Sequence, residues 1–375
     1  MATTKLSTDV IDLSGNTEAL TIPKGETNST LGVEYLVVAG GGGGAGNSSG
    51  GGGGGAGGLL TATADFAITG TASFSSNATV TIGSGGYGAT LESSGAVADN
   101  GGNSVFSTIT ATGGGGARNT GSGGSSSDGG SGGGASGGTT VGAGSASPAG
   151  QGNNGGIGSN PSDIGGGGGG AGSVGQPGGN RSGSTDGQGG AAISNSITGT
   201  SVLYAGGGGG GVCDFTYNST PATAGLGGAG ISGTGGDGGQ SGDQGTDPYT
   251  ADGGVGVTNT GGGGGGGSRS AGGTNANGGA GGSGVVILRY PTANPITIGA
   301  GLTSSTPIII GTDTVVIFTA GTGTVSFGGT GTGRPSSPTE GLMRENTTTG
   351  KMEFYDGSLW QEINDTASSY ASGFI

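Results

Sequence analysis

The feature that most constrains this chain is glycine recurring on every third residue. Glycine fills 108 of the 375 positions, and the register holds over residues 227–245, 166–178 and, interrupted at Ser49, 40–58. A period of three matches neither an α-helix nor a β-strand. It is the period of the polyproline II conformation, which rises ~3.1 Å per residue and has no internal hydrogen bonds. Glycine on one face would let a neighbouring backbone approach and bond these amides, so the sequence predicts a core made of backbone.

Two other structures could carry such a tract, namely a flexible linker and a collagen-like helix. Collagen is disfavoured because the 11 prolines do not take the third position and the register breaks repeatedly. The linker is disfavoured because apolar segments at 33–38 and 285–290 bracket the tract. We therefore expect a mainly β fold with a glycine-rich polyglycine II helix bundle, little or no α-helix and a fibrous, appendage-type shape.

Composition argues against several functional classes. Leu, Ile, Val and Phe make up roughly 16% of the chain, below the ~20% typical of a packed apolar core. The net charge is −14 and the nine Lys and Arg residues are scattered, so no nucleic-acid partner is expected. Cys213 is the single cysteine and histidine is absent, which argues against an intrachain disulfide and against a His- or Cys-based metal site. No catalytic constellation exceeds chance, and we predict no enzyme activity and no cofactor.

The texture of the chain divides it into four segments. We expect an attachment segment at 1–32, a glycine-rich domain with a β base at 33–291, a region of short strands at 292–333 and a C-terminal β-meander module at 334–375. Residues 1–13 carry no apolar signal region, and no apolar run reaches the ~18 residues of a membrane span. Neither a signal peptide nor membrane insertion is therefore predicted. Strands are expected at 33–38, 59–63, 78–82, 105–111, 285–290, 296–298, 308–310, 315–318, 325–327, 342–345, 351–355 and 359–363, the last two joined by a two-residue turn at Asp356-Gly357.

Three segments carry a family resemblance. Residues 35–43 (YLVVAGGGG), 57–60 (GGLL) and 284–290 (GVVILRY) together resemble the glycine-rich domain of bacteriophage tail-fibre and virion proteins. Residues 346–360 (NTTTGKMEFYDGSLW) resemble a short module of tail fibres and other virion appendages. Residues 5–16 (KLSTDVIDLSGN) look like N-terminal segments of marine phage structural proteins.

The resemblance implies a virion structural protein, most simply a tail fibre or adhesin component made in the host cytoplasm. Loops at the distal tip of a polyglycine II bundle would contact a host receptor, either a polysaccharide or an outer-membrane protein. Other virion proteins would be partners, and the small C-terminal module favours a homotrimer. A capsid-decorating head fibre is the alternative. An ice-binding protein is a more remote one, because the segments between glycine runs are too irregular for a flat face.

The rare aromatic residues are the candidate recognition groups. Phe215, Tyr217 and Tyr249 lie between glycine runs, where rings would offer large contact area to a receptor, although they could equally cover a bundle end. Tyr355 and Trp360 are interpreted as packing residues and Cys213 as an inert thiol. A calcium site is conceivable among loop aspartates, but aspartate favours turns and no metal is predicted. These aspartates are Asp237, Asp243, Asp247 and Asp252.

Overall fold

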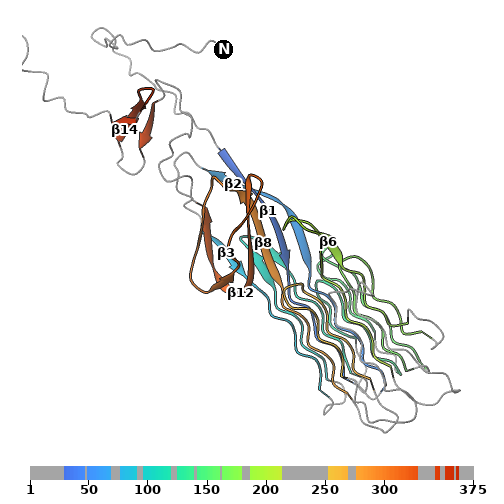
Figure 1. Cartoon of the computed structure of the whole chain (residues 1–375). Helices are drawn as coiled ribbons and strands as arrows, with labels where there is room; N and C mark the ends of the chain where they lie inside the picture. The colour runs from blue at the N-terminus through green and yellow to red at the C-terminus, as the bar shows by residue number, and fades with distance from the viewer. Residues whose placement is uncertain are drawn as a thin grey trace, which may run out of the picture.

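The computed structural model (Figure 1) is mainly β. Within the residues that it describes there is no helix, which confirms the expected mainly β class with little or no α-helix. The strands form sheets of ten, three and two strands. The described residues are 29–46, 49–68, 77–90, 96–119, 125–138, 142–160, 163–179, 186–212, 252–268, 276–327, 343–346, 351–358 and 360–362.

The ten-stranded sheet curls into a nearly closed barrel. Its strand order is β2-β1-β8-β12-β3-β4-β5, and β5 returns to contact β1 and β2. The short strands β9, β10 and β11 also pair with the long strand β12. The bounds are β1 Ser29–Val38, β2 Leu59–Ile68, β3 Ala78–Thr81, β4 Ser104–Phe106, β5 Ile109–Ala111, β8 Val285–Pro291, β9 Ile296–Ile298, β10 Leu302–Ser304, β11 Ile308–Ile310 and β12 Asp313–Phe327.

Strand expectations were right where apolar β-branched residues cluster. The predicted segments 33–38 and 285–290 lie in β1 and β8, which pair antiparallel. The single strand expected at 105–111 was wrong: β4 and β5 form a hairpin there, turned at Ser107 with a φ of 55°. The separate strands expected at 315–318 and 325–327 were also wrong, since both belong to β12. Strands β6 (Ile193–Asn195), β7 (Val202–Tyr204) and β10 had not been predicted.

The apolar core follows the alternation of strand side chains. On β1, Val33 and Val37 face the barrel interior, whereas Leu36 and Val38 face outward into a second cluster. The interior is completed by rings such as Tyr290, whose centroid lies 5.0 Å from that of Phe327 in an edge-to-face arrangement. Leu36, Val38 and Ile287 of the outward cluster are packed against the β6–β7 hairpin through Ile197 and Tyr204.

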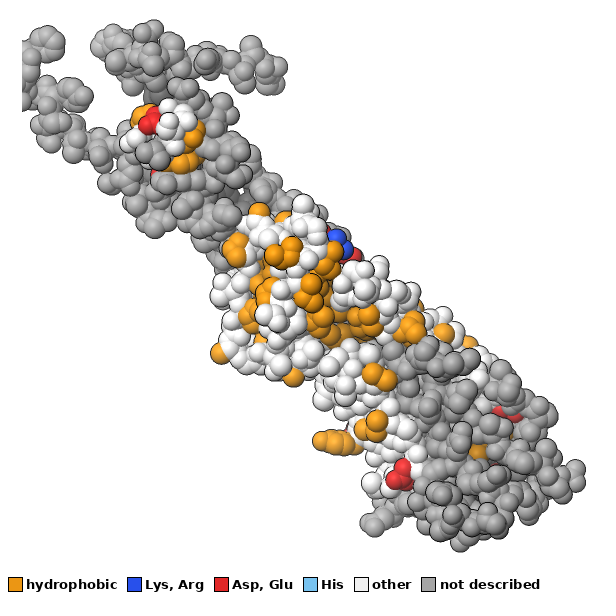
Figure 2. All heavy atoms as spheres, viewed as in Figure 1, with side chains coloured by type: hydrophobic (Ala, Val, Ile, Leu, Met, Phe, Trp, Pro, Cys, Tyr) orange, Lys and Arg blue, Asp and Glu red, His pale blue; other side chains and the backbone are white. Residues whose placement is uncertain are grey.

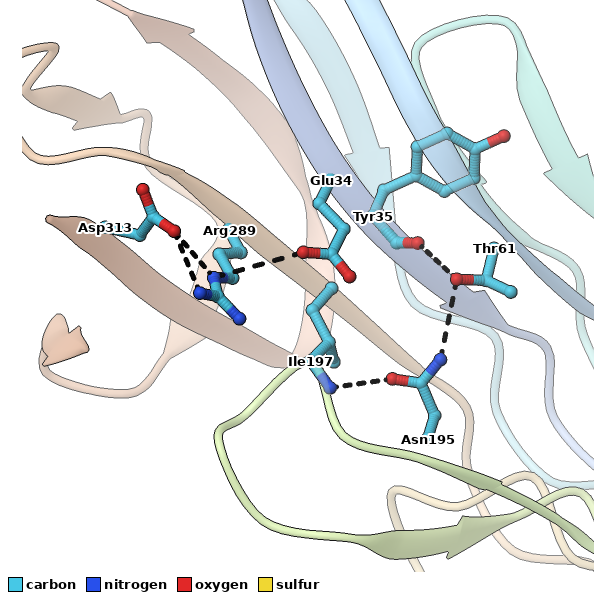
Figure 3. Close-up of polar contacts among 7 residues, drawn as sticks. All are labelled: Glu34, Tyr35, Thr61, Asn195, Ile197, Arg289 and Asp313. Atoms are coloured by element: carbon cyan, nitrogen blue, oxygen red, sulfur yellow. Dashed lines mark hydrogen bonds and ion pairs between the residues drawn. The ribbon is translucent and has the colours of Figure 1, made fainter. Parts of the chain in front are cut away.

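An ionic network closes the outer face of the barrel beside this hairpin (Figure 3). Arg289 of β8 donates from Nε to Oδ2 of Asp313 at 2.9 Å, and Nη2 lies at the same distance. Oε2 of Glu34 lies 3.9 Å from the same Nε. These groups are partly exposed, so the network contributes on the order of 1 kcal/mol at most. Asn195 links the hairpin to β2 through Thr61 Oγ1, at 3.5 Å.

The three-stranded sheet consists of β13 (Met343–Asn346), β14 (Lys351–Tyr355) and β15 (Trp360–Glu362). Tyr355 and Trp360 pair across β14 and β15, with ring centroids 5.5 Å apart. The two-residue turn expected between these strands was wrong, because the connection spans 356–359. Gly357 takes a φ of 95°, and Asp356 Oδ1 accepts the Ser358 N–H at 2.9 Å.

Extended glycine segments run side by side away from one end of the barrel (Figure 1), and we call them together the glycine layer. Several continue directly from strands: 39–46 from β1, 49–58 into β2 and 276–284 into β8. Residues 39–46 and 50–58 are buried at every position. The segments of the layer are 39–46, 49–58, 83–90, 96–103, 112–119, 125–138, 142–147, 151–160, 163–171, 175–179, 186–192, 205–212, 252–257, 261–268 and 276–284.

Backbone hydrogen bonds between segments replace side-chain packing in this layer. Three successive amides, those of residues 42, 43 and 44, donate to three different segments: Gly42 to Gly55 (2.8 Å), Gly43 to Asp99 (3.0 Å) and Gly44 to Gly279 (2.8 Å). The cycle then repeats, since Ala45 donates again to the segment of Gly55, at Gly52. The direction of the bond in this segment therefore recurs every third residue.

Gly54 tests how tightly these backbones pack. A Cβ at this buried position would meet the carbonyl group of Gly42. Overpacking costs about 1–3 kcal/mol, which outweighs the ~0.4–1 kcal/mol that alanine gains by restricting the unfolded chain. We expect Gly54→Ala to lower the free energy of unfolding by about 2 kcal/mol in denaturant titrations. Ser84→Val, which adds bulk at an exposed position of the same layer, should change it by less than ~0.5 kcal/mol. Equal effects would contradict backbone packing.

Tyr290 predicts a loss of stability at alkaline pH. Burial in the barrel raises its pKa from 10.0 to about 12. Below pH ~10 both folded and unfolded states hold the proton, so the stabilisation is complete; above it only the folded state does, and stability falls as pH rises. The loss approaches about 3 kcal/mol by pH 12. Unfolding midpoints measured between pH 9 and 11.5 should fall less steeply for Tyr290→Phe than for the wild type, and equal slopes would contradict the assignment.

Candidate functional site

Side chains of the glycine layer stand in outward-facing rows. In segment 83–90, Ser84, Tyr87 and Thr90 are exposed, while Gly83, Gly86 and Ala89 are buried. The same spacing exposes Asn154, Ile157 and Asn160 in 151–160, and Asp252, Val255 and Thr258 after residue 251. Extended backbone advances ~3.1–3.4 Å per residue, so successive side chains of one row lie about 9–10 Å apart. The layer thus presents regularly spaced groups on a backbone scaffold, and on the face shown in Figure 2 its described surface carries few hydrophobic side chains.

Segment 39–46 shows how the inner positions are enclosed. Its N–H groups donate to 49–58, 96–103 and 276–284. Its carbonyl groups accept from 83–90, 112–119 and 261–268. Six neighbours surround it, so no direction is left for a side chain, and the segment holds nothing larger than alanine.

At the edges of the layer, polar side chains stand in for missing neighbours. Asn100 Oδ1 accepts the Gly116 N–H and Asn103 Oδ1 accepts the Gly113 N–H, both at 2.8 Å. The two asparagines and the two amides are each three residues apart, as the layer's period requires. The same substitution of a side-chain oxygen for a neighbouring carbonyl is made by Gln151, Asp128, Asn154, Ser173 and Asp252.

The end of the layer remote from the barrel borders the residues expected to bind a receptor. Val212 ends a segment that starts at β7, and Asp252 caps the amide of Asn277 at 2.7 Å, at the start of the segment that leads into β8. Both therefore lie roughly 22 Å from the strands. Val212 is fully buried with Ile164, and its amide donates to Ser268 Oγ at 3.0 Å.

The predicted receptor-binding residues Phe215, Tyr217 and Tyr249 lie outside the described residues, and their role stays a prediction. Cys213 and three of the four loop aspartates, at 237, 243 and 247, lie outside them as well. The fourth, Asp252, is exposed and acts as a backbone cap. What the described part of the chain brings to this end is a small apolar plug of Ile164 and Val212 with capped amides around it.

Two features of the candidate site had not been predicted from the sequence. Tyr87 is 78% exposed on the side of the layer, and the asparagines at 100 and 103 cap its edge. The asparagine caps could have been identified from the Asn-x-x-Asn spacing, because this spacing equals the three-residue period of the glycines. Tyr87 could have been identified as a row position, since it lies between Gly86 and Gly88 in a segment of small residues.

The described residues hold few ionisable groups arranged for chemistry. Among them, no group of three His, Cys, Asp or Glu side chains could hold a metal ion. Burial raises the pKa of Tyr204, which packs where the barrel meets the layer. Within the part of the chain that the structure describes, no helix is long and apolar enough to cross a membrane.

Comparison with known proteins identifies the glycine tract as a family feature. The family model described as "Glycine-rich domain" matches residues 13–291, which is most of the chain. No curated protein and no solved structure matches the sequence. The family description states composition, and it names neither a ligand nor an activity.

The asparagine caps predict a local effect on amide exchange. Asn100→Leu and Asn103→Leu would each remove the acceptor of a buried glycine amide, at a cost of about 1–3 kcal/mol. We expect the amides of Gly116 and Gly113, respectively, to exchange with deuterium much faster than in the wild type. Asn160→Leu is the matched control, because this exposed asparagine caps no amide among the described residues. Unchanged exchange at 113 and 116 would refute the capping role.

Proposed function

The chain belongs to the glycine-rich domain family, and from that premise we propose that it is a structural component of a phage virion appendage, a tail fibre or adhesin component. The observation that carries the proposal is the glycine layer itself. A barrel whose strands continue into a bundle of bonded backbones supplies a stiff projection with few ionisable groups. Such a body suits display of loops at a distance from an attachment point. The resemblances of 5–16 and 346–360 to virion modules add independent support.

We further infer that the segments of the layer are polyglycine II helices. Support comes from donation to the same neighbour at every third residue and from the six neighbours around 39–46. The exposure of every third side chain in 83–90 adds a second, independent sign of three residues per turn. A twisted β-ladder would instead pair each segment with two neighbours.

The remote end of the layer is the proposed contact with the host surface. Residues 213–251 join Val212 to Asp252, and both of these border residues lie at that end. A receptor-binding role for Phe215, Tyr217 and Tyr249 would use this placement, with a polysaccharide or an outer-membrane protein as the partner. Ring faces give large contact area with little rotamer entropy to lose.

A homotrimer is the proposed assembly. The β13–β15 sheet has three strands and exposes Phe354 by 37%, while Glu353 is buried. A sheet of this size gains stability when its apolar face is covered. Association of three chains would cover it, and other virion proteins would hold the N-terminal segment.

Labelling of virions tests the proposed function. Gold-conjugated antibody against this chain, applied to particles whose genome encodes it, should decorate the tail fibres or baseplate in negative-stain images. Added purified protein should also slow adsorption of these particles to host cells, because it competes for the receptor. Label confined to the capsid would show that the protein is a head fibre and not a tail fibre component. Particles without label would refute a virion role.

A further inference from the structure

Tyr87 is an exposed aromatic side chain on the flank of the glycine layer. It is 78% exposed, and it is the one aromatic side chain in the described segments of the layer. A tyrosine ring offers 150–250 Å² of surface whose burial is favourable, so such exposure on a scaffold made mostly of small residues leaves contact area open to a partner. The ring is held by a segment fixed on its buried side, through Gly86 and Ala89 to the carbonyls of Gly41 and Gly44.

Asp99 lies next to Tyr87 on the neighbouring segment. Its amide donates to the Tyr87 carbonyl at 2.9 Å, which puts the two residues at the same level. Three successive residues of this segment take three directions: Ala98 is buried, and Asn100 reaches over 112–119 to cap Gly116. The remaining direction, that of Asp99, is the side of segment 83–90, because a Cβ at Gly102, three residues further on, would meet Gly83 and Ser84. Asp99 is exposed, so its carboxylate is available as a hydrogen-bond acceptor on that side.

The surroundings of the ring are small and polar. The residues three positions before and after Tyr87 are Ser84 and Thr90, both exposed. The residues three positions before and after Asp99 are Ala96 and Gly102. The described neighbours of the ring along the row are therefore small, and hydroxyl groups recur about 9 Å to either side. We call Ser84, Tyr87, Thr90 and Asp99 the Tyr87 strip.

This combination matches the chemistry of sugar recognition. The C–H face of a pyranose stacks on an aromatic ring, while its hydroxyls bond carboxylate, amide and hydroxyl groups. The Asp99 charge and a net charge of −14 disfavour acidic sugars. We propose that the Tyr87 strip binds a neutral polysaccharide laid along the layer, with Tyr87 as the stacking platform and Asp99 as an acceptor of sugar hydroxyls. The proposal rests on the proposed function, and it names the receptor class as carbohydrate.

Affinity electrophoresis of the full-length protein tests this proposal. Native gels would contain no sugar, or one of three neutral polysaccharides: dextran, yeast mannan or hydroxyethylcellulose. We expect at least one of these to retard the wild-type protein. Tyr87→Ala should weaken the apparent affinity about fivefold or more, whereas Tyr87→Phe, which keeps the ring, should stay within about twofold. Asp99→Ala should also weaken binding.

Ile157→Ala is the matched control, because Ile157 is 61% exposed in another segment of the layer and lies outside the strip. It should migrate as the wild type does. Retardation by none of the gels, or equal retardation of wild type and Tyr87→Ala, would overturn the proposal. Virion labelling with no retardation would overturn the strip while leaving the appendage role intact. If the gels retard the wild-type protein but not Tyr87→Ala, while virions take no antibody label, sugar binding by the strip stands and the appendage role is refuted.

Discussion

The whole structure depends on the hydrogen bond between one glycine backbone and the next. Because each amide of an inner segment points to a different neighbour in turn, a single segment has no stability of its own and needs several others around it. Close approach is what demands glycine: at Gly54 a side chain would occupy the space of the Gly42 carbonyl. A core of this kind needs little apolar content, which reconciles a low Leu, Ile, Val and Phe fraction with extensive burial.

The barrel supplies what the glycine layer lacks, namely a starting register. β1 and β2 pair up to Val38 and Leu59, and the next bond, from Ala39 to Gly58, already belongs to the layer. Apolar side chains such as Val37 and Val286 fix this alignment, because a slip by one residue would turn them out of the core. The first hydrogen bonds of the layer continue the register of the paired strands. At the lateral edges of the layer, asparagine and aspartate side chains bond the outermost amides, so no further segment is needed there.

Sequence reasoning succeeded where side chains carry information. Val33 to Val38 and Val285 to Tyr290 are apolar runs bounded by glycine, and both are strands. The three-residue glycine period predicted a bundle of bonded backbones, and its polyglycine II form stays a prediction. The period could not say which segments are neighbours, because glycines are identical and no side chain marks a partner. The β6–β7 hairpin was missed since Ile193–Asn195 and Val202–Tyr204 are short and owe their pairing to the barrel face beneath them. In the candidate site, the three-residue spacing of the capping asparagines and of Tyr87 is present in the sequence. Its role could be recognised only once the neighbouring segments of the glycine layer were known.

A core built from peptide groups also has a thermal consequence. Heat capacity rises when apolar surface is exposed on unfolding and falls when polar surface is exposed. The inner segments 39–46 and 50–58 bury mostly backbone, so their contribution to the heat-capacity change is small or opposite in sign to that of the barrel. The stability curve of the molecule is then flatter than that of an ordinary domain of equal size. A flatter curve extends toward low temperature before cold unfolding sets in.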